Sequence, residues 1–190
     1  MLHELVTNDK YAEYDLIVHH IYIVNRENRH QAEAKAVKSI VPYYKKIKDF
    51  LYTESVFNTS GFAPLKSIRF PFDMDVCAFL AANICAARPE VAHVAMGRTK
   101  TDVSSGGSNF SMRMQRAQNI FKSTLMLQGG EMPEYIFPVV DMTKEEIWNN
   151  LPETVRPNTW YCRTPLYTDN MARPCGKCIT CKDVQSFING

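Results

Sequence analysis

The sequence predicts an α/β fold in which helices cover both faces of a parallel sheet. Four β-rich runs alternate with helical segments before Leu151, which is the element order of βαβ units. Hydrophobic residues make up 45% of the chain and charged residues 22%, so disorder, collagen and coiled coil are excluded for the whole chain. The 190 residues suffice for one ordinary domain and a small appendage.

The strand candidates are short runs rich in apolar and β-branched side chains. They span residues 15–24, 51–57, 91–96 and 135–140. Ligands of parallel sheets bind at the carboxyl ends of the strands. We therefore expect the site in the loops that follow Val24, Phe57, Met96 and Val140.

Helical periodicity or composition marks the segments between the strands. The expected helices span residues 1–6, 29–50, 72–87 and 109–127, and another opens at Thr143 with a capping-box pattern to Glu146. Pro42 predicts a kink or a division of the second of these helices. Residues 97–108 are predicted as a polar loop, and residues 105–109 (Ser-Gly-Gly-Ser-Asn) could bind an anion through free N–H groups or form a solvated loop.

The net charge and the hydropathy of the chain limit the kinds of partner that it is expected to bind. The net charge of +2 does not favour tight non-specific binding of nucleic acid. The longest strongly apolar stretch, residues 78–87, is too short to cross a bilayer. The acidic N-terminal residues show no signal-peptide pattern, so we expect a cytoplasmic protein.

The strongest chemical signal is a cysteine cluster near the C-terminus, made of Cys162, Cys175, Cys178 and Cys181. Two overlapping Cys-x-x-Cys pairs supply three thiolates to one ion, and Cys162 completes a tetrahedron. The pattern predicts a structural zinc site without an open position, whereas an iron–sulfur cluster and four free thiols are the alternatives. Cys77 and Cys85 lie apart, in a helical stretch.

The tail that carries these cysteines is predicted to be a separate segment. We expect an α/β domain over residues 1–155 and a zinc-binding tail over residues 156–190. Prolines at positions 152, 157, 165 and 174 predict that this region has no long helix.

Two other polar groups lie in or beside the first strand. His19 and His20 alternate in direction, so they face opposite sides of the sheet, where packing is favoured over catalysis. Residues 25–29, Asn-Arg-Glu-Asn-Arg, follow the strand and either contact a nucleotide or cap the next helix.

Three segments resemble the 7-cyano-7-deazaguanine synthase family. The segment CRTPLYTDNMARPCGKCITCKDV, which begins at Cys162, resembles the zinc segment of that family. Residues 28–30 (Asn-Arg-His) resemble its Gln-Arg-His segment, and residues 138–147 resemble its strand-to-helix stretch ahead of the cysteines. The resemblance runs from about Asp15 to the end of the chain.

The resemblance implies a Rossmann-like fold of the adenine nucleotide alpha hydrolase type. It implies a C–N ligase that converts 7-carboxy-7-deazaguanine and ammonia to the nitrile, with ATP and Mg²⁺, for queuosine- or archaeosine-type deazapurine biosynthesis. The carboxylate is adenylated and amidated, and the amide is then activated again and dehydrated. We expect no membrane and no direct nucleic-acid partner, and a homodimer is one assembly to test. An enzyme of the same superfamily that thiolates or amidates nucleic acid is another alternative.

The family's Ser-Gly-Gly-x-Asp-Ser phosphate loop would precede the residues given. From this we expect a chain that binds the deazapurine better than it turns over ATP. The alternatives are a non-catalytic zinc-containing relative or one half of a split enzyme. Arg98, Asp102 and Arg163 are the expected polar contacts of the substrate, and no catalytic residue is assigned.

Overall fold

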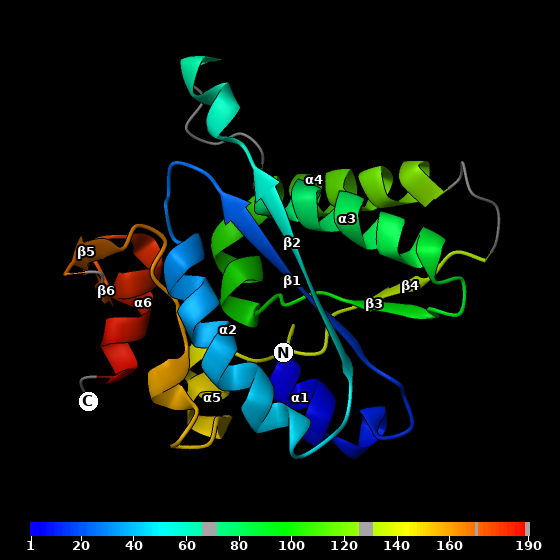
Figure 1. Cartoon of the computed structure of the whole chain (residues 1–190), viewed down its shortest axis with the longest axis horizontal. Helices are drawn as coiled ribbons and strands as arrows, with labels where there is room; N and C mark the ends of the chain where they lie inside the picture. Colours follow the sequence, from blue (N-terminus) through cyan, green and yellow to red (C-terminus); the bar gives the residue numbers. More distant parts are fainter. Residues whose placement is uncertain (66–71, 126–130, 170, 189–190) are drawn as a thin grey trace. The chain divides into compact units, whose positions relative to one another are not determined.

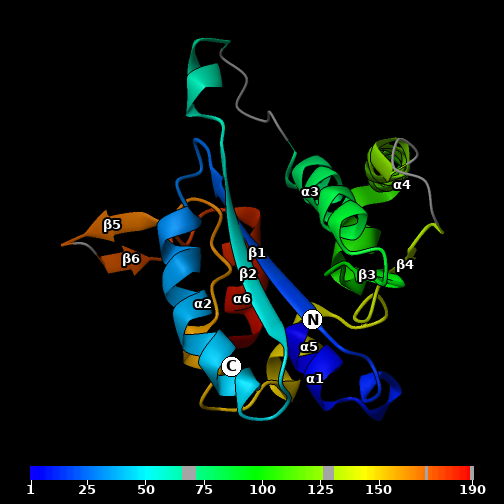
Figure 2. The same ribbon diagram turned by 45° about the vertical axis from the view of Figure 1, so that its right-hand side comes forward.

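The structure is a computed structural model of the chain, and it describes residues 1–65, 72–125, 131–169 and 171–188. Contacts divide the chain into two compact units. Unit 1 contains Met1 and Arg69–Thr143, and unit 2 contains Leu2–Ile68 and Lys144–Gly190. Figures 1 and 2 label the helices and strands of both units.

Unit 2 is built on a parallel pair of strands. Strands β1 (Ile17–Val24) and β2 (Leu51–Asn58) pair along their whole length, with Ile17 opposite Leu51 and Val24 opposite Asn58. Helix α2 (His30–Lys45) connects them, so the three elements form the predicted βαβ unit. Figure 1 shows α2 lying alongside the two strands. The helix continues through Pro42 and ends at Lys45, five residues before the expected end.

The core of unit 2 joins segments from both ends of the chain. Helices α1 (Leu2–Thr7) and α5 (Lys144–Asn150) flank it, together with three short 3₁₀ segments, Asp9–Tyr11, Ser60–Leu65 and Arg156–Asn158. The buried cluster is Val41, Tyr44, Phe50 and Val155. Because Val155 packs against residues of α2, the segment directly before the tail is part of this core.

Unit 1 packs two helices against each other. Helices α3 (Asp73–Ala87) and α4 (Lys100–Leu125) lie side by side in both views, and β3 (His93–Ala95) pairs in parallel with β4 (Glu134–Ile136). The buried cluster is Ala78, Ala82, Cys85, Ala117 and Phe121. Its alanines allow close approach of the helices, and Phe121 is the large side chain that fills the remaining space.

The polar loop predicted over residues 97–108 is wrong, because α4 begins at Lys100. Thr99 and Asp102 form a capping box: the amide of Asp102 donates to Thr99 Oγ1 at 3.2 Å, and the amide and hydroxyl of Thr99 donate to Asp102 Oδ2 at 3.2 and 2.9 Å. The backbone of residues 105–109 is therefore helical, and its N–H groups bond to carbonyls one turn earlier. It does not form the expected anion-binding loop.

The sheet is also smaller than predicted. All four predicted strands are present, but the described residues form two separate two-stranded parallel sheets, β1–β2 and β3–β4. The β3 and β4 strands have three residues each: β3 lies inside its predicted run, whereas β4 begins one residue before the predicted run 135–140 and ends at Ile136, and residues 138–141 form a turn. The fold is therefore a mixed helix and strand structure with small parallel sheets.

The tail contains two elements that sequence analysis did not predict. Strands β5 (Leu166–Thr168) and β6 (Met171–Arg173) form an antiparallel hairpin, and α6 (Ile179–Ile188) follows. Among the described residues after Leu151, the longest helix is α6, which has ten residues and begins beyond Pro174, the last of the prolines. The tail belongs to the same unit as residues 2–68, and its separate folding stays a prediction.

A helix that crosses a bilayer needs about 20 consecutive, predominantly apolar residues. None of the helices within residues 1–65, 72–125, 131–169 and 171–188 is long and apolar enough to cross a bilayer.

Candidate metal centre

The predicted cysteine cluster is confirmed. One Sγ atom from each of Cys162, Cys175, Cys178 and Cys181 lies within 4.8 Å of the other three, and all four thiols are free of disulfide bonds. The sulfurs of Cys175 and Cys181 are 3.9 Å apart. A tetrahedron with metal–sulfur bonds of about 2.3 Å has edges of about 3.8 Å. The residues therefore fit a single metal ion, whereas an iron–sulfur cluster places several atoms between its cysteines.

Local backbone geometry brings the second and third cysteines together. Gly176 has a φ of +68°, which turns the chain sharply after Cys175. Cys178 directly precedes α6, and the amide of Cys181 donates to Cys178 Sγ at 3.4 Å. Cys178 thus caps α6 with its sulfur, and the positive end of the helix dipole lies at the metal centre.

Backbone amides and one hydroxyl group donate further hydrogen bonds to the cysteine sulfurs. Cys162 Sγ accepts the amide of Cys175 at 3.2 Å. Cys175 Sγ accepts the amides of Lys177 at 3.4 Å and Cys178 at 3.3 Å, and the Thr164 hydroxyl at 3.3 Å. Hydrogen bonds of this kind stabilise the thiolate form, which is the form that binds a metal.

These surroundings shift the thiol pKa values in opposite directions. The Thr164 hydroxyl and the amides of Lys177 and Cys178 lower the pKa of Cys175 to about 5. Burial raises the pKa of Cys162, and it raises that of Cys181 to about 12. For Cys178 burial opposes ionisation, but hydrogen bonds from the Arg163 and Cys181 amides leave the pKa below its usual value. Hydrogen bonds thus favour the thiolate at Cys175 and Cys178, whereas burial favours the neutral thiol at Cys162 and Cys181, where the charge of a bound cation would offset the cost of ionisation.

The tail is anchored to the rest of unit 2 by polar contacts. Arg163 Nη2 lies 2.8 Å from Glu27 Oε1, and the Tyr167 hydroxyl donates to the carbonyl of Asn28 at 2.6 Å. Both partners lie in the loop after β1. On the other side, Lys144 of α5 forms an ion pair of 3.0 Å with Asp183 of α6. The metal centre therefore lies against the carboxyl end of β1.

The three residues predicted to contact substrate fall in different units. Arg98 and Asp102 belong to unit 1, and Arg163 belongs to unit 2. The carboxylate of Asp102 caps α4, and the guanidinium of Arg163 binds Glu27. Their role in substrate binding stays a prediction. Thr164 and Tyr167 were missed, since no spacing rule connects them with the cysteines. Glu27 lies in the segment 25–29 considered as a nucleotide contact or a helix cap, but its contact with Arg163 was not predicted.

The two histidines of β1 face opposite sides of the sheet as predicted. His19 Nδ1 is 2.8 Å from Thr53 Oγ1, and its Nε2 is 2.9 Å from Ser55 Oγ. Burial lowers the pKa of His19. On the other face, the ring of His20 contacts the edge of Tyr22, and the ring centroids are 4.4 Å apart. Both histidines therefore pack against neighbouring side chains.

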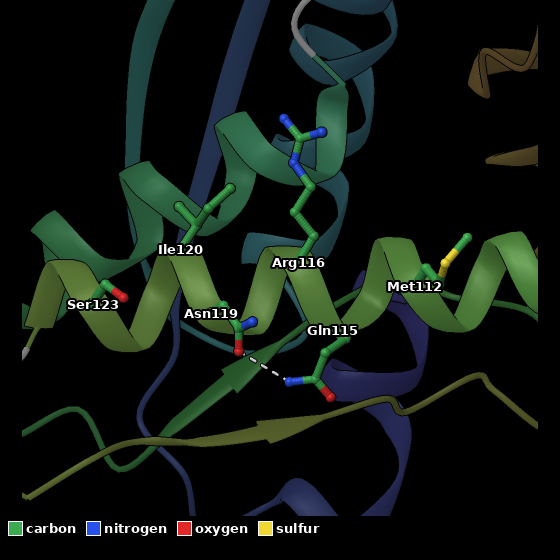
Figure 3. Close-up of a pocket in the computed structure, with 6 residues that line it drawn as sticks. All are labelled: Met112, Gln115, Arg116, Asn119, Ile120 and Ser123. Atoms are coloured by element: carbon green, nitrogen blue, oxygen red, sulfur yellow. Dashed lines mark hydrogen bonds between the residues drawn. The ribbon is translucent and has the colours of Figure 1, made fainter.

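A shallow groove of about 490 Å³ lies on unit 1, along α4 (Figure 3). The six residues that line it are Met112, Gln115, Arg116, Asn119, Ile120 and Ser123. The Gln115 amide donates to Asn119 Oδ1 at 3.0 Å, and Arg116 binds Asp75 at 2.8 Å. Three polar side chains of the groove are thus engaged in protein contacts, and we assign it no chemistry.

A comparison with protein-family models, curated proteins and solved structures finds no match for this chain. Functional assignment therefore depends on its own residues and on the resemblance of the cysteine segment.

We expect Thr164→Val to weaken metal binding by about 10- to 100-fold, because it removes the hydroxyl that donates to Cys175 Sγ. Competition with a chromophoric chelator measures the affinity. Thr168→Val, at an exposed position of β5, is the matched control and should leave the affinity unchanged. Equal affinities of the two variants would contradict a role for Thr164.

Proposed function

We propose that the chain is a zinc-containing, ATP-dependent C–N ligase of the 7-cyano-7-deazaguanine synthase type, with a Rossmann-like nucleotide-hydrolase fold. The observation that carries the proposal is the segment that begins at Cys162. Its residues resemble the family's zinc segment, and its four sulfurs lie close enough to hold one ion. The substrates are 7-carboxy-7-deazaguanine, ammonia and ATP with Mg²⁺.

The chemistry of the donor set supports a structural role for zinc. Four thiolates fill a tetrahedral coordination sphere and leave no position for water or substrate. Zinc bound there would stabilise the fold of residues 162–181 and would not activate a nucleophile. We therefore expect the substrates to bind and react outside the four-cysteine site.

The carboxyl ends of β1 and β2 support a ligand position in unit 2. Residues 25–29 follow β1, and Thr59 follows β2. The amide and hydroxyl of Thr59 both donate to the Val24 carbonyl, at 2.9 and 3.0 Å. This contact holds the two strand ends together at the edge where parallel sheets bind ligands.

One observation favours a second candidate, a non-catalytic zinc-containing substrate-binding relative or one half of a split enzyme. The segment 105–109 is helical, so it does not supply a phosphate-binding loop. A protein of this kind binds 7-carboxy-7-deazaguanine without consuming ATP.

The test begins with the metal content of the purified chain, expected to be one zinc ion per chain. The chain is then titrated with 7-carboxy-7-deazaguanine in a calorimeter and incubated with ATP, Mg²⁺ and ammonium. Mass spectrometry detects the nitrile. Binding with slow nitrile formation is the result expected of the proposed ligase, whereas binding with no ATP consumption and no nitrile would favour the second candidate. Absence of both binding and turnover would overturn both candidates.

A matched pair of arginine variants locates the contact. Arg163→Ala should weaken binding of the deazapurine, because an arginine pairs with its carboxylate and Arg163 lies in the same unit as the ends of β1 and β2. Arg173→Ala is the control, since Arg173 is an exposed residue of β6 in that unit. Equal affinities of the two variants would contradict the assignment of Arg163.

A further inference from the structure

The loop after β1 has a conformation that needs support. The amide of Glu27 donates to Asn25 Oδ1 at 3.0 Å, and the amide of Asn28 donates to the Asn25 carbonyl at 3.1 Å. Asn28 has a φ of +52°, in the left-handed region that few non-glycine residues adopt. Two local hydrogen bonds and an unfavourable backbone angle make this loop dependent on its neighbours.

The neighbours that hold the loop come from the metal-binding tail. Arg163 Nε and Nη2 both donate to Glu27 Oε1, at 3.1 and 2.8 Å. The Tyr167 hydroxyl donates to the Asn28 carbonyl at 2.6 Å. The Glu27 side chain is 24% exposed and that of Arg163 is 42% exposed, so water screens the carboxylate of this pair only in part.

Both tail residues are positioned by the cysteines. Arg163 directly follows Cys162, and its backbone amide bonds to the sulfur of Cys178. Tyr167 lies in β5, within the stretch between Cys162 and Cys175. A metal ion bound by four sulfurs would therefore fix the backbone that carries Arg163 and Tyr167.

The charge contacts continue from the loop into α2. Arg29 Nε lies 3.4 Å from Glu27 Oε2 and 3.1 Å from Glu33 Oε1. Arg163, Glu27, Arg29 and Glu33 thus form a row of alternating charges from the metal centre to the first turn of α2. A change in the position of Arg163 acts directly on the Glu27 carboxylate that Arg29 also contacts.

We propose that metal binding at the four cysteines is coupled to the ordering of residues 25–29, through the Arg163–Glu27 ion pair and the Tyr167–Asn28 hydrogen bond. The metal then controls the shape of a loop at the carboxyl end of β1, where a parallel sheet binds its ligand. This coupling rests on metal binding by the cysteines, and it does not depend on the identity of the substrate.

The test is amide hydrogen exchange of the full chain, measured by mass spectrometry with Zn²⁺ bound and after removal of Zn²⁺ by a chelator. The metal content of each sample is determined first, so failure to bind metal is distinguished from failure of the coupling. On metal removal, we expect exchange in residues 25–29 to become about tenfold faster or more. Residues 73–87 of α3 report global unfolding and should not change.

Two variants distinguish a direct coupling between the metal and residues 25–29 from a general loss of structure in the tail. With Zn²⁺ bound, the double variant Arg163→Ala/Tyr167→Phe should exchange in residues 25–29 as fast as the metal-free protein, while the cysteine segment stays protected. Arg173→Ala, an exposed arginine of β6, is the control and should exchange like the parent chain. Parent-like exchange in the metal-bound double variant, or no effect of metal removal on residues 25–29, would overturn the proposal.

Discussion

Cys178→Ser is expected to abolish stable metal binding and to unfold the tail from about Arg156 onward. The substitution removes one of the four sulfurs, whereas the serine hydroxyl can still accept the Cys181 amide and cap α6, so the loss reports on the metal site. Structural zinc sites contribute about 10–16 kcal/mol in small zinc domains, so loss of one ligand removes much of the tail's folding free energy. Metal analysis after dialysis should find no bound ion. Limited proteolysis should cut within residues 156–188 of the variant and spare the parent chain.

The cysteines of α3 provide matched controls. Cys77 is partly buried and Cys85 is buried, and both lie in unit 1. Cys77→Ser and Cys85→Ser should each lower the free energy of unfolding by roughly 1–3 kcal/mol and leave the metal content unchanged. Equal metal loss in all three variants would contradict the four-cysteine site.

Phe121→Ala should cost unit 1 about 3–5 kcal/mol of unfolding free energy. The Phe121 side chain is 1% exposed, and its ring meets the edge of Tyr135 with centroids 4.7 Å apart. Its buried neighbours are alanines and one cysteine, which cannot refill the cavity. Urea unfolding followed by circular dichroism measures the loss.

Phe79→Ala serves as the control for this substitution. Phe79 lies on α3 of the same unit and is 45% exposed, so its truncation should cost about 1 kcal/mol or less. Both variants should keep the metal, because the cysteines lie in unit 2. A similar loss of stability in the two variants would show that Phe121 is not the main packing residue of unit 1.

The fold was predictable where a local pattern is strong. The apolar run of β1 and the periodicity of α2 predicted a βαβ unit, and the parallel register of β1 and β2 confirms it. The start of α4 was not predictable from composition, since a segment with two glycines and several hydroxyl side chains has low helix propensity. The Thr99–Asp102 capping box and the packing of α4 on α3 outweigh that propensity.

The size of the sheets also could not be predicted from local sequence patterns. Each of the four strands has a sequence signal, but pairing is a long-range property that no single run contains. The predicted four-stranded sheet therefore became two pairs. The hairpin β5–β6 escaped prediction because its strands have three residues each, too few for a visible alternation.

The sequence by itself identified the candidate metal ligands, because the Cys-x-x-Cys-x-x-Cys spacing brings three sulfurs together through local turns. Only the tertiary structure decided what surrounds them. Thr164 and Arg163 meet the sulfurs of Cys175 and Cys178, and Glu27 meets Arg163 across 136 positions of the chain. Such contacts arise from the docking of the tail on the end of β1, and their energies depend on burial and distance, which are properties of the folded chain.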